Sequence, residues 1–293
     1  MRLPVRRRLA PARLAVIADL HFGLAPDALA RFDAFLHAAA ARSFDAYLQM
    51  GDFCYSDAGA AECLARWHAV AAPRLNVLGN HDMDKCDKPT AMQAFGMPRR
   101  YYAATIGGYR LVVLDLNNFR KDGALYPYAN GNYFTDHAVW NCADPDQLAW
   151  LREELGTATD PVILISHQPL GFADAGQPLP VEQVEVLDVV SEMAARNPRG
   201  AVAACLSGHL HVDRLEHAAG APCVLLNSSS YFWYNGMHPY TNPLYAFLEF
   251  TPDGTLRIEG RSGAFVKPPP VASDGVLGRS ASITSRDLPL RHR

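Results

Sequence analysis

The chain has 293 residues, of which 49% are hydrophobic, so it can bury a sizeable core in one large α/β domain or in two smaller ones. Its formal net charge of −3 excludes a bulk attraction to nucleic acid or to an anionic membrane, although it is compatible with local basic patches. No stretch is apolar for long enough to span a bilayer, and the six cysteines show no C-x-x-C spacing. We therefore expect a cytoplasmic, disulfide-free protein with one main domain over residues 1–265 and a Pro/Ser/Arg-rich C-terminal tail over residues 266–293.

Strands and helices alternate in the first part of the chain. A buried strand is predicted over residues 14–18, because five apolar residues of β-branched and small types precede Asp19 and His21. Helical spacing over 26–41 and 58–70 separates this strand from two more, over 46–50 and 74–78. The second strand ends at Gly51-Asp52, and the third ends at Gly79-Asn80-His81-Asp82. Ligands of open α/β sheets bind beyond the carboxyl ends of the strands, so three successive units deliver metal-competent side chains there.

From residue 101 the chain no longer alternates single strands with helices. Residues 101–106 and 109–116, separated by Gly107-Gly108, predict a hairpin that feeds a core strand. Residues 117–141 predict a long irregular aromatic segment and residues 231–240 a second aromatic loop, each either a packed subcore or a substrate mouth. The other predicted elements are a helix over 145–155, a strand over 161–166 before His167, a helix over 181–196, a strand over 201–206 before Ser207-Gly208-His209-Leu210-His211, and two strands of a second, more antiparallel sheet over 224–227 and 244–250.

Seven side chains at these strand ends can ligate metal ions, namely Asp19, His21, Asp52, Asn80, His167, His209 and His211. They are too many for one tetrahedral zinc ion, which takes four ligands. Their mixed nitrogen and oxygen donors suit two divalent ions such as Mn, Fe, Zn, Co or Ni better than the all-oxygen shell of Mg or Ca. A two-metal site needs at least one carboxylate that bridges the ions.

These residues carry a resemblance to a known family. Five blocks occur in order: Asp19-x-His21, Gly51-Asp52, Gly79-Asn80-His81-Asp82, His167 after an apolar strand, and Gly208-His209-x-His211. In this order they resemble the calcineurin-like metallophosphoesterases over residues 14 to about 212. The resemblance implies an α/β (α+β) four-layer fold in which a central β-sandwich is flanked by helices.

The resemblance also implies a role for each residue. Asp52 bridges two divalent transition-metal ions, of which one is also held by Asp19, His21 and His211, and the other by Asn80, His167 and His209. His81 faces the leaving-group oxygen, and Asp82 either pairs with His81 or caps the next turn. Weaker candidates for phosphate or substrate contacts are Asn118, Arg120 and His238.

The function that follows is a dinuclear metal-dependent phosphoester hydrolase. The metals lower the pKa of a bridging water, and His81 donates a proton or hydrogen bond to the departing alkoxide. We expect a phosphodiesterase that acts on a small soluble, cyclic-nucleotide-like substrate through metal-bound hydroxide. Nucleic acid is a less favoured partner, a membrane partner is not expected, and the native metals and the oligomeric state stay open.

Other branches of the family fit less well. The segment from Gly51 to Asp57 lacks the Arg with which protein phosphatases grip phosphate, and purple acid phosphatases share Tyr55 but lack the residue equivalent to His21. Lipid-precursor pyrophosphatases commonly carry Arg where His81 stands. A nuclease or phosphomonoesterase is the alternative. Against a nuclease, the net negative charge gives no sign of a basic surface that would follow the phosphates of a nucleic acid. A non-catalytic metal-binding scaffold is the third hypothesis, which the complete ligand set disfavours.

Overall fold

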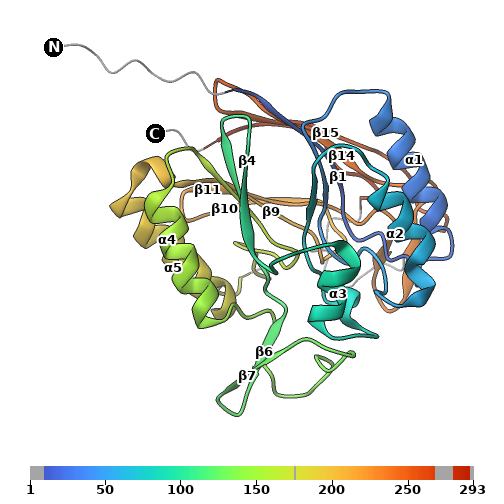
Figure 1. Ribbon diagram of the computed structural model, residues 1–293, viewed down its shortest axis with the longest axis horizontal. Helices are drawn as coiled ribbons and strands as arrows, with labels where there is room; N and C mark the ends of the chain where they lie inside the picture. Colours follow the sequence, from blue (N-terminus) through green and yellow to red (C-terminus); the bar gives the residue numbers. More distant parts are fainter. Residues whose placement is uncertain (1–9, 175, 268–279, 291–293) are drawn as a thin grey trace.

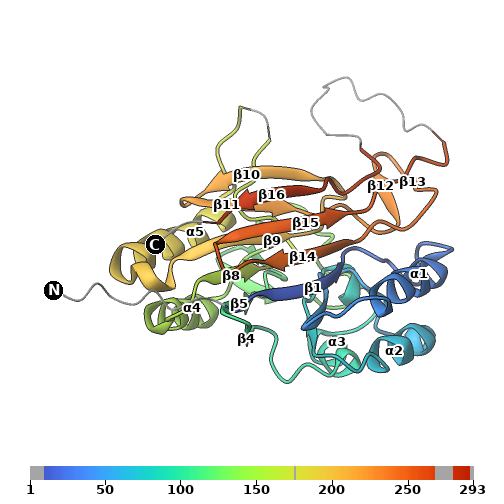
Figure 2. The ribbon, with the colours of Figure 1, turned by 90° about the horizontal axis from the view of Figure 1, so that it is seen from above.

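Two six-stranded sheets stack face to face in the computed structural model, and helices cover the outer faces (Figures 1 and 2). The structure describes residues 10–174, 176–267 and 280–290. Helices α1 (Ala28–Ala40), α2 (Ala61–His68) and α3 (Lys88–Phe95) lie on one side, and α4 (Pro145–Thr157) and α5 (Val181–Arg196) lie on the other. The described residues also form the short 3₁₀ helices η1 (Ala58–Ala60), η2 (His81–Met83) and η3 (Pro198–Gly200). The expected β-sandwich flanked by helices is confirmed.

The first sheet has the strand order β16-β15-β14-β1-β2-β3. Its strands are β1 (Ala12–Ile17), β2 (Ala46–Gln49), β3 (Arg74–Asn76), β14 (Ala246–Phe250), β15 (Thr255–Gly260) and β16 (Arg286–Pro289). Strands β1, β2 and β3 run parallel, and β14 to β16 extend the sheet in antiparallel fashion from the free edge of β1.

The second sheet has the order β10-β11-β9-β8-β5-β4. Its strands are β4 (Tyr102–Ile106), β5 (Tyr109–Val113), β8 (Val162–Ile165), β9 (Val202–Ser207), β10 (Arg214–Ala218) and β11 (Ala221–Leu225). Strands β5, β8, β9 and β11 are parallel, and β8 and β9 are buried along their whole length. This burial explains their continuous apolar sequences, because a central parallel strand is covered on both faces.

The prediction that residues 224–227 and 244–250 belong to one sheet is wrong. Strand β11 lies parallel to β9 in the second sheet, whereas β14 pairs with β1 in the first, with Leu14 opposite Leu248. Strand β1 already has β2 on one side, so its other edge takes β14 from the far end of the chain. Alternating apolar residues show a buried face but do not show which sheet provides the neighbour.

Strand β1 divides its side chains between two cores. Leu14 and Val16 pack in the core between the sheets, while Ala15 and Ile17 pack beneath the helices against residues such as Phe32. Successive side chains of a strand point to opposite faces, so one short strand ties the two layers together. The ends of β1 and its parallel neighbours are therefore fixed points for the loops that follow them.

Both aromatic segments fold into small hairpins, which corrects the prediction that residues 117–141 are irregular. The first contains β6 (Asn118–Lys121) and β7 (Ala124–Pro127), and the second contains β12 (Tyr231–Trp233) and β13 (Met237–Pro239). Asp122-Gly123 turns the first hairpin and has positive φ at both residues. An Asp-Gly pair between short strands indicates a hairpin, because the two central residues of a tight hairpin turn require φ above zero and these residue types tolerate it.

The C-terminal segment contributes to the first sheet where the structure describes it. Strand β16 pairs with β15, and Ile283, Leu288 and Leu290 are buried. Residues 268–279 and 291–293 lie outside the described residues, so the division of the chain at residue 265 stays a prediction. Within the described ranges, no helix has the length and apolar character needed to cross a membrane. All six cysteines are free and buried.

Candidate metal centre

The predicted ligands lie in loops that directly follow parallel strands of the two sheets. Backbone bonds continue the pairing past the strand ends, with Asp19 N donating to Gly51 O at 3.2 Å and His21 N donating to Asp52 O at 2.9 Å. The loops of the two sheets also meet, because the His209 amide donates to Asp19 Oδ1 at 3.1 Å. The stacked sheets therefore bring both groups of loops to one place.

Five of the seven predicted ligands have left-handed backbone conformations. The φ angles are 50° at Asp19, 53° at His21, 49° at Asp52, 77° at His209 and 53° at His211. Non-glycine residues rarely adopt positive φ, and such strain concentrates at functional sites. The chain turns sharply at these positions, immediately after each strand.

Glycines allow these loops to approach one another. A Cβ atom on Gly79 would lie 2.1 Å from the backbone nitrogen of Asp52, and one on Gly208 would lie 2.6 Å from Asp19 Oδ2. These distances are far below van der Waals contact, so any side chain at either position would displace a carboxylate-bearing loop. The two glycines thus serve close packing around the site.

Three groups of potential ligands lie with their donor atoms within 4.8 Å of one another. They are Asp19 with His21 and His211, His21 with Asp52 and His81, and Asp52 with His167 and His209. The first and third groups each contain three of the four residues that the resemblance assigns to one metal ion, and Asp52 belongs to the second and third. All the predicted ligands except Asn80, which offers an amide, are thus present in these groups.

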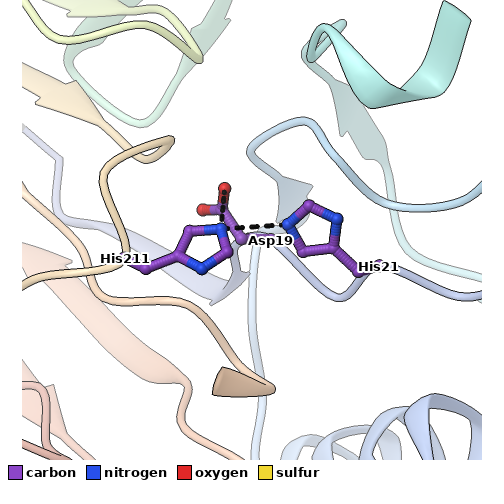
Figure 3. Close-up of side chains that lie close together, drawn as sticks. All are labelled: Asp19, His21 and His211. Atoms are coloured by element: carbon purple, nitrogen blue, oxygen red, sulfur yellow. Dashed lines mark hydrogen bonds and ion pairs between the residues drawn. The ribbon is translucent and has the colours of Figure 1, made fainter. Parts of the chain in front are cut away.

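The first group is incompletely satisfied by protein partners (Figure 3). His21 Nε2 lies 3.0 Å from His211 Nε2, which is also 3.4 Å from Asp19 Oδ1. The Nδ1 atoms of both histidines are buried without a hydrogen-bond partner. Burial lowers the pKa of His21 well below its usual value despite the nearby Asp52, so the ring is neutral and offers a lone pair. Converging imidazole nitrogens and a carboxylate oxygen form a donor set suited to a transition-metal ion.

His167 gives the clearest test of whether the donor set fits a cation. Its Nδ1 lies 2.8 Å from the Met50 carbonyl oxygen, which can only accept, so Nδ1 carries the proton. Its Nε2 therefore faces Asp52 Oδ2 at 3.1 Å and His209 Nδ1 at 3.2 Å. Metal-ligating histidines usually donate their other ring N–H to a carbonyl or carboxylate in this way.

The pKa values of His167 and His209 also indicate that Asp52 attracts a positive charge to this position. Burial alone would lower the pKa of His167, but Asp52 outweighs it and raises the pKa to about 9. Burial, followed by the charge of His167, lowers the pKa of His209 to about 3. A divalent cation between these groups would satisfy the Asp52 carboxylate and use the lone pairs of both rings. The residues present therefore fit the metal ions that the family implies.

Asp52 occupies the middle of the centre. Its Oδ1 accepts the His81 backbone N–H at 2.8 Å, while its Oδ2 lies 3.1 Å from His167 Nε2 and 3.8 Å from His21 Nε2. Burial would raise the pKa of Asp52, but His167 and His81 hold it well below its usual value. The carboxylate is thus ionised and lies between a histidine of each predicted metal group.

Asn80 contributes a free acceptor. Its side-chain oxygen is buried without a partner, whereas its amide nitrogen donates to the Tyr133 hydroxyl at 3.3 Å. An unpartnered buried carbonyl oxygen costs free energy unless a ligand takes it up. This orientation agrees with the amide oxygen ligand inferred from the sequence.

His81 contacts a carboxylate, but the contact is made by Asp84 and not by Asp82. His81 Nδ1 lies 2.7 Å from Asp84 Oδ2, and the Tyr133 hydroxyl also donates to Asp84. Burial would lower the pKa of His81, but Asp52 and Asp84 together raise it to about 9. Of the two alternatives expected for Asp82, the pairing with His81 is therefore wrong, since Asp84 makes that contact.

Asp82 instead braces the backbone of the site. Its Oδ1 accepts from the amides of Phe53 and Cys54 at 2.8 and 3.1 Å, and its Oδ2 accepts from Gly79 at 2.8 Å. Burial, and then the charge of Asp52, raises the pKa of Asp82 to about 7. These three bonds hold the loop after β2 against the loop after β3.

The weaker candidates lie in other interactions. Arg120 forms a two-point ion pair with Glu185, with both N–O distances 3.0 Å. Asn118 accepts from Lys88 and donates to the Cys142 carbonyl, and His238 contacts the Tyr234 carbonyl at 2.9 Å. None of the three belongs to the metal-competent groups of the described residues.

Two residues next to the centre were missed from the sequence, Tyr133 and Tyr231. Tyr231 packs against His21 and His211 with ring centroids 5.0 and 4.8 Å apart, and Tyr133 reaches His81 and Asp84. Both lie in the aromatic segments that the sequence indicated as a subcore or a substrate mouth. No spacing rule links them to the ligands, since they come from loops distant in sequence.

Comparison with known proteins supports the family identified from the motifs. The sequence model described as calcineurin-like phosphoesterase matches residues 12–213. A dimetal phosphatase from Danio rerio is similar in structure, with a TM-score of 0.63 and 15% identity over 85% of this chain and 96% of that one. GAP50, described as the anchor in the inner membrane complex of Plasmodium, has a TM-score of 0.58 and 12% identity over 97% and 90%. A comparison with curated sequences gives no match.

Proposed function

Because the chain belongs to the calcineurin-like phosphoesterase family, we propose that it is a dinuclear metal-dependent phosphodiesterase acting on small soluble, cyclic-nucleotide-like esters. The observation that carries the proposal is the position of Asp52. Its Oδ2 lies between His21 and His167, which belong to opposite groups of potential ligands. A carboxylate shared in this way is what a two-metal site requires.

The proposed ligand sets are those that the family resemblance implies. Asp19, His21, Asp52 and His211 would hold one ion, and Asp52, Asn80, His167 and His209 would hold the other. When bound, two divalent ions such as Mn, Fe or Zn supply Lewis acidity to the phosphoryl oxygens and a nucleophile at neutral pH. The protein's own contribution is to fix the donor atoms, through the strained loops after β1, β2 and β9 and through the Met50 carbonyl behind His167.

His81 is proposed as the group that assists the leaving oxygen. Its Nδ1 is engaged by Asp84, so the opposite nitrogen of the ring is free to donate toward the substrate. Asp84 keeps the imidazole oriented, because its Oδ2 lies 2.7 Å from His81 Nδ1. A protonated, oriented imidazole can donate a proton to a departing alkoxide.

Exposed apolar side chains around the centre support a substrate that carries a ring. Phe134 is 74% exposed with its ring centroid 6.5 Å from that of His81. Trp233 is 56% exposed and its ring lies 6.3 Å from that of Tyr231. Leu210, between two proposed ligands, is 39% exposed. Apolar groups exposed beside a polar centre are typical of binding surfaces, and aromatic ones stack on planar ligands.

Two alternatives are distinguished by experiment. A nuclease or phosphomonoesterase would use the same metal centre on another ester. A non-catalytic scaffold is the third hypothesis, and one similar structure is described as an anchor. The filled ligand set and the His81–Asp84 pair favour catalysis. A cytoplasmic location is proposed from the six free, buried cysteines, which fit a reducing compartment.

Hydrolysis of a substrate panel with added Mn tests the proposal. The panel contains bis-nitrophenyl phosphate, nitrophenyl phosphate, 2′,3′- and 3′,5′-cyclic nucleotides and single-stranded DNA. We expect the highest kcat/KM on a cyclic or simple diester. Preference for the monoester or for DNA would favour the corresponding alternative, and metal binding without turnover of any member would favour the scaffold.

A further inference from the structure

We infer that Tyr133 is a positioning residue that orients two groups of the centre at once: the side-chain amide of Asn80 and, through Asp84, the imidazole of His81. The inference rests on the proposed function, since it assigns Tyr133 a part in that reaction. It is carried by the hydrogen bonds of a single hydroxyl group. That hydroxyl reaches Asn80, Asp84 and His81, which lie close together on the segment after β3.

The donor and acceptor roles of the hydroxyl are fixed by its partners. A phenol has one hydrogen to donate, and a carboxylate can only accept, so the Tyr133 O–H donates to Asp84. Two contacts of the hydroxyl oxygen remain, with Asn80 and with His81 Nδ1, both at 3.3 Å, and in the first of them the amide must donate. The Asn80 NH₂ group therefore faces Tyr133, and the amide oxygen points the other way.

The orientation of Asn80 bears directly on metal binding. An amide can rotate by half a turn and exchange its nitrogen for its oxygen, and only the oxygen can ligate a cation. In the observed orientation that oxygen is buried and has no protein partner. Without the Tyr133 hydroxyl, the amide would lose the acceptor that holds its nitrogen away from the proposed ligand position.

The second group is His81. Asp84 accepts from His81 Nδ1 with one oxygen at 2.7 Å and from Tyr133 with the other. The hydroxyl bond thus restrains the carboxylate that contacts the imidazole. Loss of that bond would leave Asp84 free to change rotamer, and the orientation of His81 would become less defined.

Tyr133 is itself held firmly. Its side chain is buried, and its ring packs against Tyr128 and Phe134 with centroids 4.7 and 4.4 Å apart. The preceding backbone is tied to the end of η2 and to the segment after it, since Gly131 N donates to Met83 O at 3.2 Å and Asn130 N donates to Cys86 O at 2.9 Å. The segment after β7 therefore forms a fixed wall of the centre.

A purely structural role for Tyr133 makes a different prediction. If only the ring mattered for packing, replacement by Phe would keep the aromatic contacts and leave metal binding and leaving-group dependence unchanged. Tyr128 offers a matched control in the same segment. It is also buried, and its hydroxyl donates to Asn141 Oδ1 and accepts from Asn141 N, both at 3.0 Å, away from the proposed ligands.

The experiment compares Tyr133→Phe, Tyr128→Phe and the unchanged protein. Mn affinity is measured by calorimetric titration of the metal-free protein, and kcat/KM is measured on diesters with good and poor leaving groups. We expect Tyr133→Phe to weaken one of two Mn sites by about tenfold, as replacement of groups that orient ligands typically does. We also expect a larger loss on the poor leaving group than on nitrophenyl, and no change of either kind in Tyr128→Phe.

Combination with His81→Ala separates the two effects. In that background, Tyr133→Phe should no longer change the leaving-group dependence, while it still weakens one Mn site. Tyr133→Phe that matches Tyr128→Phe in both measurements, in a protein that binds two Mn ions and hydrolyses diesters, would overturn only this inference. Failure of the unchanged protein to bind Mn would overturn the proposed function as well. Thermal unfolding without metal checks that each variant is folded.

Discussion

Two buried charged clusters in this protein differ in how completely their polar atoms are paired. In one, Lys88 Nζ donates to Asp115 Oδ2 at 2.6 Å, to the Asn117 carbonyl at 2.8 Å and to Asn118 Oδ1 at 3.1 Å. Asp115 also accepts from Arg100 at 3.3 Å. The three protons of the ammonium group are thus all used, as a buried charge requires.

The metal centre shows the opposite pattern. His21 Nδ1, His211 Nδ1 and Asn80 Oδ1 are buried without partners, and the loops that carry most of the ligands have positive φ. Burial and charge alone therefore do not distinguish a structural cluster from a functional one. The unpartnered Asn80 oxygen and the ligand residues held at positive φ do, because the fold tolerates such costs at positions where a bound ligand takes up the oxygen. The two clusters should respond differently to mutation. Changes in the first should lower the free energy of unfolding, and changes in the second should reduce metal binding and kcat/KM.

The largest effect should come from Asp52→Asn. Removal of the bridging charge should abolish binding of at least one metal ion and lower kcat/KM by at least about 10³-fold, because metal ions contribute several kcal/mol to such reactions. Metal content and diester hydrolysis are the measurements. The exposed Asp45, whose carboxylate accepts the Arg13 amide, provides the control Asp45→Asn. Normal activity of Asp52→Asn would remove the basis for treating this cluster as the functional one.

Lys88→Met should have the converse effect. It leaves Asp115 buried with less compensation, and removal of one partner of a buried ion pair typically costs about 3–5 kcal/mol. Urea unfolding of the metal-free protein measures the loss, and Mn titration should still give two sites at temperatures where the variant is folded. An unchanged free energy of unfolding with loss of metal would mean that the two clusters have been assigned the wrong way round.

His81→Ala should keep both metal ions and lower kcat/KM on diesters with poor leaving groups by about 10²-fold, the usual size of a general acid contribution. Nitrophenyl substrates need little protonation of the leaving oxygen, so their loss should be much smaller. Equal losses on both kinds of substrate would assign His81 to metal binding or packing. His81 would then have a structural role like that of the residues in the Lys88–Asp115 cluster.

The smallest expected effect concerns acid stability. Burial would raise the pKa of Asp115, but Lys88 and Arg100 outweigh it and lower the pKa below its usual value. A carboxyl group with a lowered pKa in the folded state stabilises it above the unfolded pKa of about 3.9, and this contribution is lost as the pH falls through the folded pKa. In Lys88→Met the burial effect gains weight and raises the folded pKa of Asp115 toward or above the unfolded value, so the loss of stability between pH 5 and pH 3 should become smaller or reverse. Unfolding free energies measured from pH 3 to 7 test this, and parallel curves for the two proteins would contradict it.

The sequence allowed the ligands to be found because of where they lie. Asp19, Asp52 and His167 each follow an apolar strand, and parallel strands of one sheet end at the same edge. The sheet assignment of β14 was missed, because alternation shows a buried face but not a neighbour. Asp122-Gly123 carried a hairpin signal that the length of the aromatic segment obscured.

The partner of His81 could not be found in the same way. Asp82 is adjacent in sequence, but the turn of η2 carries its side chain to the Gly79 amide and brings Asp84 to the imidazole instead. Tyr133 lies 49 residues from Asp84, and only the packing of the segment after β7 brings them together. The ligands can be recognised in the sequence because each follows an apolar strand. The groups that orient them can be recognised only from tertiary contacts.

The central claim is a two-metal centre in which Asp52 is shared, and titration of the metal-free protein with Mn while diester hydrolysis is followed tests it most directly. The account predicts two Mn ions bound per chain, with full activity appearing only as the second ion binds and disappearing with a chelator. Binding of a single ion at full activity, or hydrolysis that persists after the metal is removed, would contradict it.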